Sequence, residues 1–248
     1  MMRFSKILII IIFTALTSSC VKDKKESAAT LYLDAHQLLK DKDYITAAET
    51  FEKIIDEYPF SKWGVDGQIM SVYARYKDDD YVNMVSNIDN FISLNPANEY
   101  IDYMFYMKGI AYYDQIPNIY RAQNISQESL LIFNNLISRF PNSKYSADAK
   151  SKLSFITDHI AGSYMSKARF QYKQNNYIGA INNFLVVIDN YKNSNQTPEA
   201  YYRLAETYIN LGATDLAKKS LKFLKENYDN SFWHKLAEKN LKSFTQDD

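Results

Sequence analysis

The 248-residue sequence predicts an all-α fold, a solenoid of about five helical hairpins with a C-terminal capping helix. Two observations support this prediction. An apolar motif at helical spacing recurs along the chain, and the prolines after its first two copies, Pro59 and Pro96, lie 37 residues apart. Only 6 Gly and 5 Pro are present, too few for an all-β fold built on tight turns. The chain is long enough for one sizeable core or one long solenoid.

The first segment, residues 1–19, is predicted to be a lipoprotein signal peptide. Arg3 and Lys6 precede a largely apolar run over residues 7–16, and three small residues then lead to Cys20. This order of charged, apolar and small residues is typical of a secretory signal. A ten-residue helix spans about 15 Å, half of a hydrocarbon core of about 30 Å, so a permanent membrane span is the weaker interpretation.

The residues before Cys20 resemble the bacterial lipobox, in which the cysteine thiol receives a diacylglycerol. Thr17 stands where leucine is usual, and Cys20 is the single cysteine of the chain. The resemblance implies lipidation of Cys20, and several acyl chains would anchor the protein stably. Val21 in place of aspartate favours sorting to the outer membrane. Residues 20–27 are then a lipidated, solvated tether. The alternative is an ordinary secretory signal with an incidental cysteine.

The second helix of each predicted hairpin carries the recurring motif. Counted from Tyr44, core residues follow at offsets 3, 7 and 10, and Pro59 follows at offset 15. The first three offsets place side chains on one helix face, and proline ends the helix. The motif residues of the five copies are Ala47, Phe51 and Ile54; Met84, Ile88 and Phe91; Ser129, Phe133 and Leu136; Ala180, Phe184 and Val187; and Ala217, Leu221 and Leu224.

The first helix of each hairpin precedes the motif across a short polar turn, as at residues 40–43 and 175–176. Spacing predicts an insertion at residues 114–124, between the helices of the third hairpin. It also predicts one unusually long helix, or two stacked ones, after Tyr145. Ser231 is expected to cap a last helix over Phe232 to Phe244.

These hairpins resemble the tetratricopeptide repeat, since Tyr201, Leu204, Ala205 and Tyr208 are followed by Ala217 in that repeat's spacing. The resemblance assigns residues 28–248 to one repeat domain. In such repeats the small residue of the first helix lets the two helices approach closely. Stacking then buries faces that one hairpin cannot bury alone.

Several local motifs along the mature chain are more specific than the repeat itself. They are Tyr44-x3-Ala48-x2-Phe51, Tyr58-Pro59-x-Ser61, Val72-Tyr73-Ala74-x-Tyr76-Lys77, Phe91-Ile92-x-Leu94-Asn95-Pro96, Ile101-Asp102-Tyr103-x2-Tyr106-Met107-x-Gly109 and Phe140-Pro141-Asn142-Ser143-x-Tyr145. With these motifs, essentially the whole mature chain resembles the BamD family (also called ComL), lipoproteins of the outer-membrane β-barrel assembly (BAM) complex. Lys192 and Asp229 depart from the family's prolines. The resemblance implies a non-catalytic subunit at the periplasmic face of the outer membrane. Its implied partners are a BamA-like barrel subunit, the other lipoproteins of the complex, and unfolded outer-membrane proteins.

Aromatic residues are the candidate binding residues. In the repeat fold the first helices line a concave groove, and tyrosine offers flat area and a hydroxyl for extended apolar peptides. The alternative is that these rings pack between repeats. Later first helices carry charged residues, including Arg169 and Glu206, which suit one cognate partner. The candidates for client and partner binding are Tyr32, His36, Tyr73, Tyr76, Tyr106 and Tyr113.

Several functional classes are disfavoured by the sequence. The 29 basic and 29 acidic residues leave no basic excess, so we expect no nucleic-acid partner. His36, His159 and His234 are far apart, and we expect no metal, no cofactor and no catalytic residues. The remaining alternative is a repeat lipoprotein that scaffolds peptidoglycan enzymes or the envelope-constriction apparatus.

Overall fold

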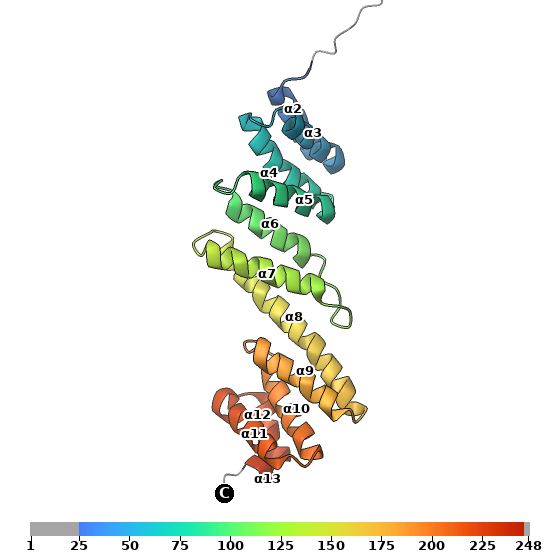
Figure 1. Ribbon diagram of the computed structural model, residues 1–248, viewed down its shortest axis with the longest axis vertical. Coiled ribbons are helices and arrows are strands. Elements are labelled where there is room, and N and C mark those ends of the chain that lie inside the picture. Colours follow the sequence, from blue (N-terminus) through green and yellow to red (C-terminus); the bar gives the residue numbers. More distant parts are fainter. Residues whose placement is uncertain (1–24, 246–248) are drawn as a thin grey trace, which may run out of the picture.

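The computed structural model describes residues 25–245, and every regular element in this range is a helix (Figure 1). The predicted signal peptide 1–19, Cys20 and most of the tether lie outside the described residues. The helices are α2 (Ala28–Lys40), α3 (Tyr44–Glu57), α4 (Lys62–Lys77), α5 (Tyr81–Leu94), α6 (Ile101–Tyr113), α7 (Asn124–Arg139), α8 (Ser146–Lys173), α9 (Tyr177–Asn190), α10 (Thr197–Asn210), α11 (Thr214–Tyr228), α12 (Phe232–Asn240) and α13 (Lys242–Thr245).

Helices α2 to α11 form five hairpins, each packing its two helices together, and the hairpins stack end to end into an elongated solenoid (Figure 1). The motif positions of the second helices form the core, since Phe51, Phe91, Phe133 and Phe184 are fully buried. First helices of neighbouring hairpins also meet directly, α2 with α4, α4 with α6, and α6 with α8. The predicted all-α stack of hairpins is therefore confirmed.

The boundaries of the second helices follow from local chemistry. The side chains of Asp43, Asp80 and Asn176 accept hydrogen bonds from backbone N–H groups of the first turn and cap α3, α5 and α9. At the other end, α3 stops two residues before Pro59 and α5 two residues before Pro96. In these helices, the capping side chains and the prolines of the sequence therefore mark where the helix begins and where it ends.

The two predicted irregularities are present. Residues 114–123 form the loop between α6 and α7, and the Nε2 of His159 on α8 donates to the carbonyl of Pro117 at 2.7 Å. The long segment after Tyr145 is one continuous helix of 28 residues, α8, rather than two stacked helices. This helix belongs to both the third and the fourth repeat, packing against α7 and α9.

One expectation needs correction. The segment from Phe232 to Phe244 is not one helix, because the chain turns at Leu241 and α13 returns Phe244 to the last core cluster. Residues 25–27, at the end of the predicted tether, are exposed and also contact the first hairpin. Lys25 pairs with Glu57 at 3.5 Å, and the Tyr58 hydroxyl donates to the carbonyl of Glu26 at 2.6 Å. Within the described range, no helix combines the length and the apolar character needed to cross a membrane.

Candidate functional site

The six aromatic candidates lie on the first helices of the front three hairpins, in pairs on α2, α4 and α6. These helices contact one another in sequence, so their exposed registers form one continuous surface. The structure places the six candidates in different surroundings. One of them, Tyr73, borders an open cavity.

The α2 pair forms an aromatic cluster with the neighbouring helices. The Tyr32 ring lies 4.6 Å from His36 and 4.7 Å from Trp63, while His36 lies edge-on to Phe51 at 5.5 Å. Burial, and secondarily the charge of Lys40, lowers the pKa of His36. These side chains are half-buried, so their principal contacts are with the first two hairpins themselves.

A cavity of about 340 Å³ lies between α4, α6 and the start of α8. We call it the tyrosine cavity, and its lining is almost wholly apolar or aromatic. Tyr73 is 38% exposed, and Tyr100 on the rim is 43% exposed, so rings are accessible from solvent. The cavity can therefore accept an apolar side chain without unfolding of the hairpins. Its lining residues are Ile69, Met70, Tyr73, Tyr100, Tyr103 and Tyr145.

Two of the lining rings, Tyr103 and Tyr145, form a row with Tyr106, which stacks on Tyr145 but lies outside the lining of the tyrosine cavity. Tyr145 lies 5.5 Å from Tyr103 and 4.8 Å from Tyr106, measured between ring centroids. The Tyr106 hydroxyl donates to Asp148 at 2.8 Å and thereby fixes the end of the row. Burial raises the pKa of Tyr103 to about 12, with neighbouring tyrosines as smaller causes. Tyr103 therefore carries no phenolate at neutral pH.

The remaining candidates pack deeper. Tyr76 is half-buried against core residues of the second and third hairpins, and burial, followed by the charge of Asp114, raises its pKa. Tyr113 packs edge-on to Phe155 at 5.7 Å, with Lys152 over its ring at 4.7 Å. Both rings join elements of the scaffold, as the alternative interpretation of the sequence expected.

The sequence analysis missed most of the residues that line the cavity. Tyr103 precedes Tyr106 by one helical turn, so the same helical register could have identified it. Tyr100 and Tyr145 were harder to assign because they stand just before α6 and α8, in the turns that follow Pro96 and Pro141. Helical periodicity does not report where a turn residue points.

The charged residues expected on later repeats form an internal network. Arg169 on α8 pairs with Glu199 on α10 at 3.0 Å, and Glu199 also lies 3.5 Å from Arg203. Arg203 in turn pairs with Glu206 at 2.7 Å. The guanidinium of Arg203 lies over the Trp233 ring at 5.3 Å. The network links the fourth and fifth hairpins, while Arg169 stays about one third exposed.

Comparison with known proteins gives consistent matches. A family described as outer membrane lipoprotein, YfiO, matches residues 24–224. The outer membrane protein assembly factor BamD of Rickettsia prowazekii is 36% identical over 249 residues, which cover 98% of this chain and 99% of that protein. The BamD of Caulobacter vibrioides is 31% identical over 204 residues, covering 82% of this chain and 67% of that protein.

Solved structures also align with the chain. The TPR2AB domain of yeast Sti1, in a complex with pHSP90, aligns over 87% of this chain and 84% of that chain, with 13% identity and a TM-score of 0.47. The TPR domain of P58(IPK) aligns over 87% of this chain and 56% of that chain, with 14% identity and a TM-score of 0.44.

Proposed function

This chain belongs to the BamD family of outer membrane lipoproteins, and we propose that its tyrosine cavity holds apolar side chains of unfolded outer-membrane proteins. Its role is that of a subunit of the β-barrel assembly complex of the outer membrane. The observation that supports the proposal is the open, apolar cavity with Tyr73 and Tyr100 at its rim.

The geometry suits a varied set of clients. The lining rings Tyr103 and Tyr145, supported by Tyr106 stacked on Tyr145, offer flat apolar area that is already ordered, so little side-chain entropy is lost on binding. Tyrosine hydroxyls at the rim can pair with the backbone of an extended segment. Because nothing in the lining carries a charge, the cavity selects for apolar side chains rather than for one sequence.

The other partners belong to the same proposal. The later repeats, with the α8–α10 ion-pair network, would dock the BamA-like barrel subunit, and other lipoproteins of the complex would bind elsewhere. A lipid on Cys20 would hold the solenoid at the periplasmic face of the outer membrane. We propose a non-catalytic role, and the relatives are named as assembly factors rather than as enzymes. Those names favour barrel assembly over the peptidoglycan scaffold.

The test is the affinity of the full-length protein, in detergent, for a fluorescent peptide. The peptide carries the C-terminal strand of an outer-membrane porin. The substitution Tyr73→Ala opens the rim while leaving the half-buried and buried rings in place, and should weaken binding about tenfold, the effect of losing one aromatic anchor.

The matched control is Tyr120→Ala, which removes a 77% exposed tyrosine from the loop between α6 and α7, outside the cavity. It should leave the affinity within about twofold, since isolated surface contacts contribute little. Equal affinities for wild type and Tyr73→Ala, or equal losses in both variants, would contradict the proposal.

A further inference from the structure

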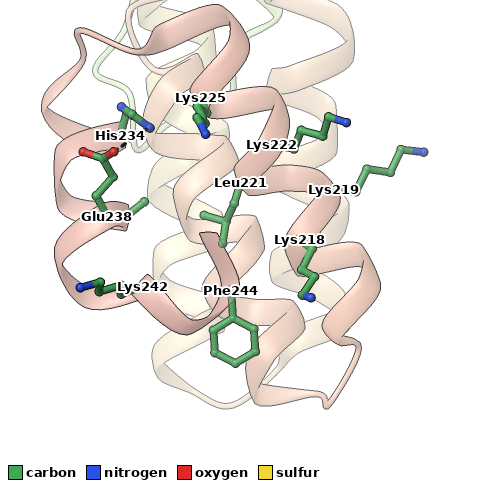
Figure 2. Close-up of a pocket in the computed structure, with 10 residues that line it drawn as sticks. Lys218, Lys219, Leu221, Lys222, Lys225, His234, Glu238, Lys242 and Phe244 are labelled. Carbon is green, nitrogen blue, oxygen red and sulfur yellow. Dashed lines mark ion pairs between the residues drawn. The ribbon is translucent and has the colours of Figure 1, made fainter. Parts of the chain in front are cut away.

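The C-terminal end of the solenoid has a second large cavity. In the interior of the stack, the second helix of each hairpin is covered by the long first helix of the next. Helix α11 has 15 residues but is covered only by α12, with 9 residues, and α13, with 4. The space left between these three helices is a pocket of about 660 Å³ (Figure 2). We call it the lysine pocket.

Positive charge surrounds this pocket. Lys218, Lys219, Lys222 and Lys225 come from α11, and Lys242 comes from α13. Figure 2 shows the α11 lysines on one side and His234, Glu238 and Lys242 on the other. Glu238 is the single carboxylate among the lining residues, and it lies 3.8 Å from the Nε2 of His234.

Three of these cations have no carboxylate partner of their own. Across residues 25–245, Lys219, Lys222 and Lys225 take part in none of the ion pairs. Like charges three or four residues apart on one helix repel one another, so an anionic ligand would relieve the repulsion. The pocket is thus complementary to negative charge.

The helix register suits a linear ligand with several carboxylates. Lys218, Lys222 and Lys225 follow one another at helical spacing on one face of α11. The rise along the axis is about 6 Å from Lys218 to Lys222 and about 4.5 Å from Lys222 to Lys225. Same-face side chains of an extended chain are about 7 Å apart. The cations are all lysines, whose mobile point charges accommodate varied carboxylates better than the fixed fork of arginine.

Between the cations the pocket is apolar. Leu221 and Ala237 are buried at its base, and Phe244 packs beside them from α13. A purely polar anion would leave the apolar base of the pocket exposed to water. A segment that alternates acidic and apolar side chains would cover it. The site therefore favours a peptide over a simple anion such as phosphate.

We propose that the lysine pocket binds an extended acidic segment of a partner protein, with carboxylates on both sides of one apolar side chain. The choice of a protein rather than an anionic membrane rests on the proposed function. In the proposed function, a lipid on Cys20 holds the N-terminal end of the protein at the membrane. The lysine pocket lies at the opposite end of the solenoid (Figure 1). We take this partner to be another subunit of the assembly complex.

The experiment uses the full-length protein and two fluorescent octapeptides at about 50 mM salt, where charge attraction is weakly screened. One octapeptide has four glutamates flanking a central leucine, and in the other the glutamates are replaced by glutamines. The charge reversals Lys222→Glu and Lys225→Glu together should weaken binding of the acidic peptide at least tenfold. The glutamine peptide should bind none of the proteins.

The matched control is the pair Lys235→Glu and Lys239→Glu, which makes the same change in net charge on exposed positions of α12 outside the pocket. It should reduce the affinity less than threefold. Circular dichroism checks that both variants keep the wild-type helix content. Because the tyrosine cavity plays no part in this binding, Tyr73→Ala should leave it unchanged, so the two proposals can fail separately.

Three results would overturn the proposal. Equal losses in the two charge-reversed proteins would indicate general attraction rather than a site. Binding to phosphatidylglycerol vesicles that depends on Lys222 and Lys225, with no binding of the acidic peptide, would assign the pocket to a membrane surface. Binding of the peptide only after removal of residues 246–248 would identify Asp247 and Asp248 as the occupants.

Discussion

Gly109 on α6 lies directly against the ring of Phe133 on α7, and a Cβ at Gly109 would come within 2.5 Å of that ring. Phe133 is fully buried and has no room to move aside. We predict that Gly109→Ala lowers the free energy of unfolding by about 1–3 kcal/mol, the usual cost of overpacking, despite alanine's better helix propensity. Urea unfolding followed by circular dichroism measures this change.

Gly162 provides the matched control for that substitution. It lies within α8, where a Cβ would meet only Ile119, at 4.0 Å. Gly162→Ala should therefore stabilise the protein by about 0.5–1 kcal/mol through helix propensity alone. If both substitutions shifted stability in the same direction, close helix approach at Gly109 would not be the cause.

The regular part of the fold could be predicted because one local pattern determines it. Offsets of 3, 7 and 10 identified side chains such as Phe51, Phe91 and Phe184, and all three are fully buried. The apolar stripe recurs in every repeat, and in most of them a capping side chain or a proline marks an end of the second helix. Repetition made the prediction secure even where Lys192 and Asp229 replace proline.

The candidate site could be predicted only in part, because it depends on contacts between repeats. Tyr73 was assigned correctly to the exposed register of α4, but Tyr76, on the same helix, is half-buried. Tyr145 belongs to the cavity through the path of the turn that precedes α8, which no periodic rule describes. The turn at Leu241 was missed for the same reason, since it depends on where Phe244 packs.

Asp80 should make the stability of the second hairpin dependent on pH. Burial favours a higher pKa for Asp80, but hydrogen bonds from Asn83 and the charge of Arg75, 3.1 Å away, lower its pKa on balance. A lowered pKa in the folded state stabilises the protein above the unfolded pKa of about 3.9, and this gain is lost as the pH falls through the folded value. Asp80→Asn should cost ~1 kcal/mol at pH 7 and close to nothing near pH 2.

Urea unfolding at the two pH values tests this dependence, and Asp43→Asn is its control. Asp43 caps α3 as Asp80 caps α5, but across the described residues it takes part in none of the ion pairs. Its substitution should have a small effect that changes little with pH, because asparagine caps helices as well as aspartate does. A pH-independent cost for Asp80→Asn would show that Arg75 contributes nothing through charge.

Cys20 is predicted to carry the lipid anchor. Cells that express the protein and are fed a clickable fatty acid should yield a labelled band, and Cys20→Ala should abolish the label because the chain has no other cysteine. The wild-type protein should also sediment with outer membranes, since several acyl chains anchor stably. Label that persists in Cys20→Ala, or a wild-type protein without label, would rule out the lipobox.

The last prediction separates client binding from docking of the barrel subunit. Tyr73 borders an apolar cavity on the second and third hairpins, whereas Arg169 lies on the charged network that joins α8 to α10. Arg169→Gln should weaken binding of the barrel subunit's periplasmic domains about threefold to tenfold and leave the porin peptide unaffected, since a partly exposed charge contributes to one cognate contact. Tyr73→Ala should weaken binding of the porin peptide and leave binding of the periplasmic domains unaffected. Both affinities are measured on both full-length variants. Arg169 is about one third exposed, and without it Glu199 keeps a second basic partner in Arg203 at 3.5 Å, so the fold should survive the substitution. If either substitution weakened both interactions equally, the two binding functions would share one surface, and the assignment of clients to the front repeats would be wrong.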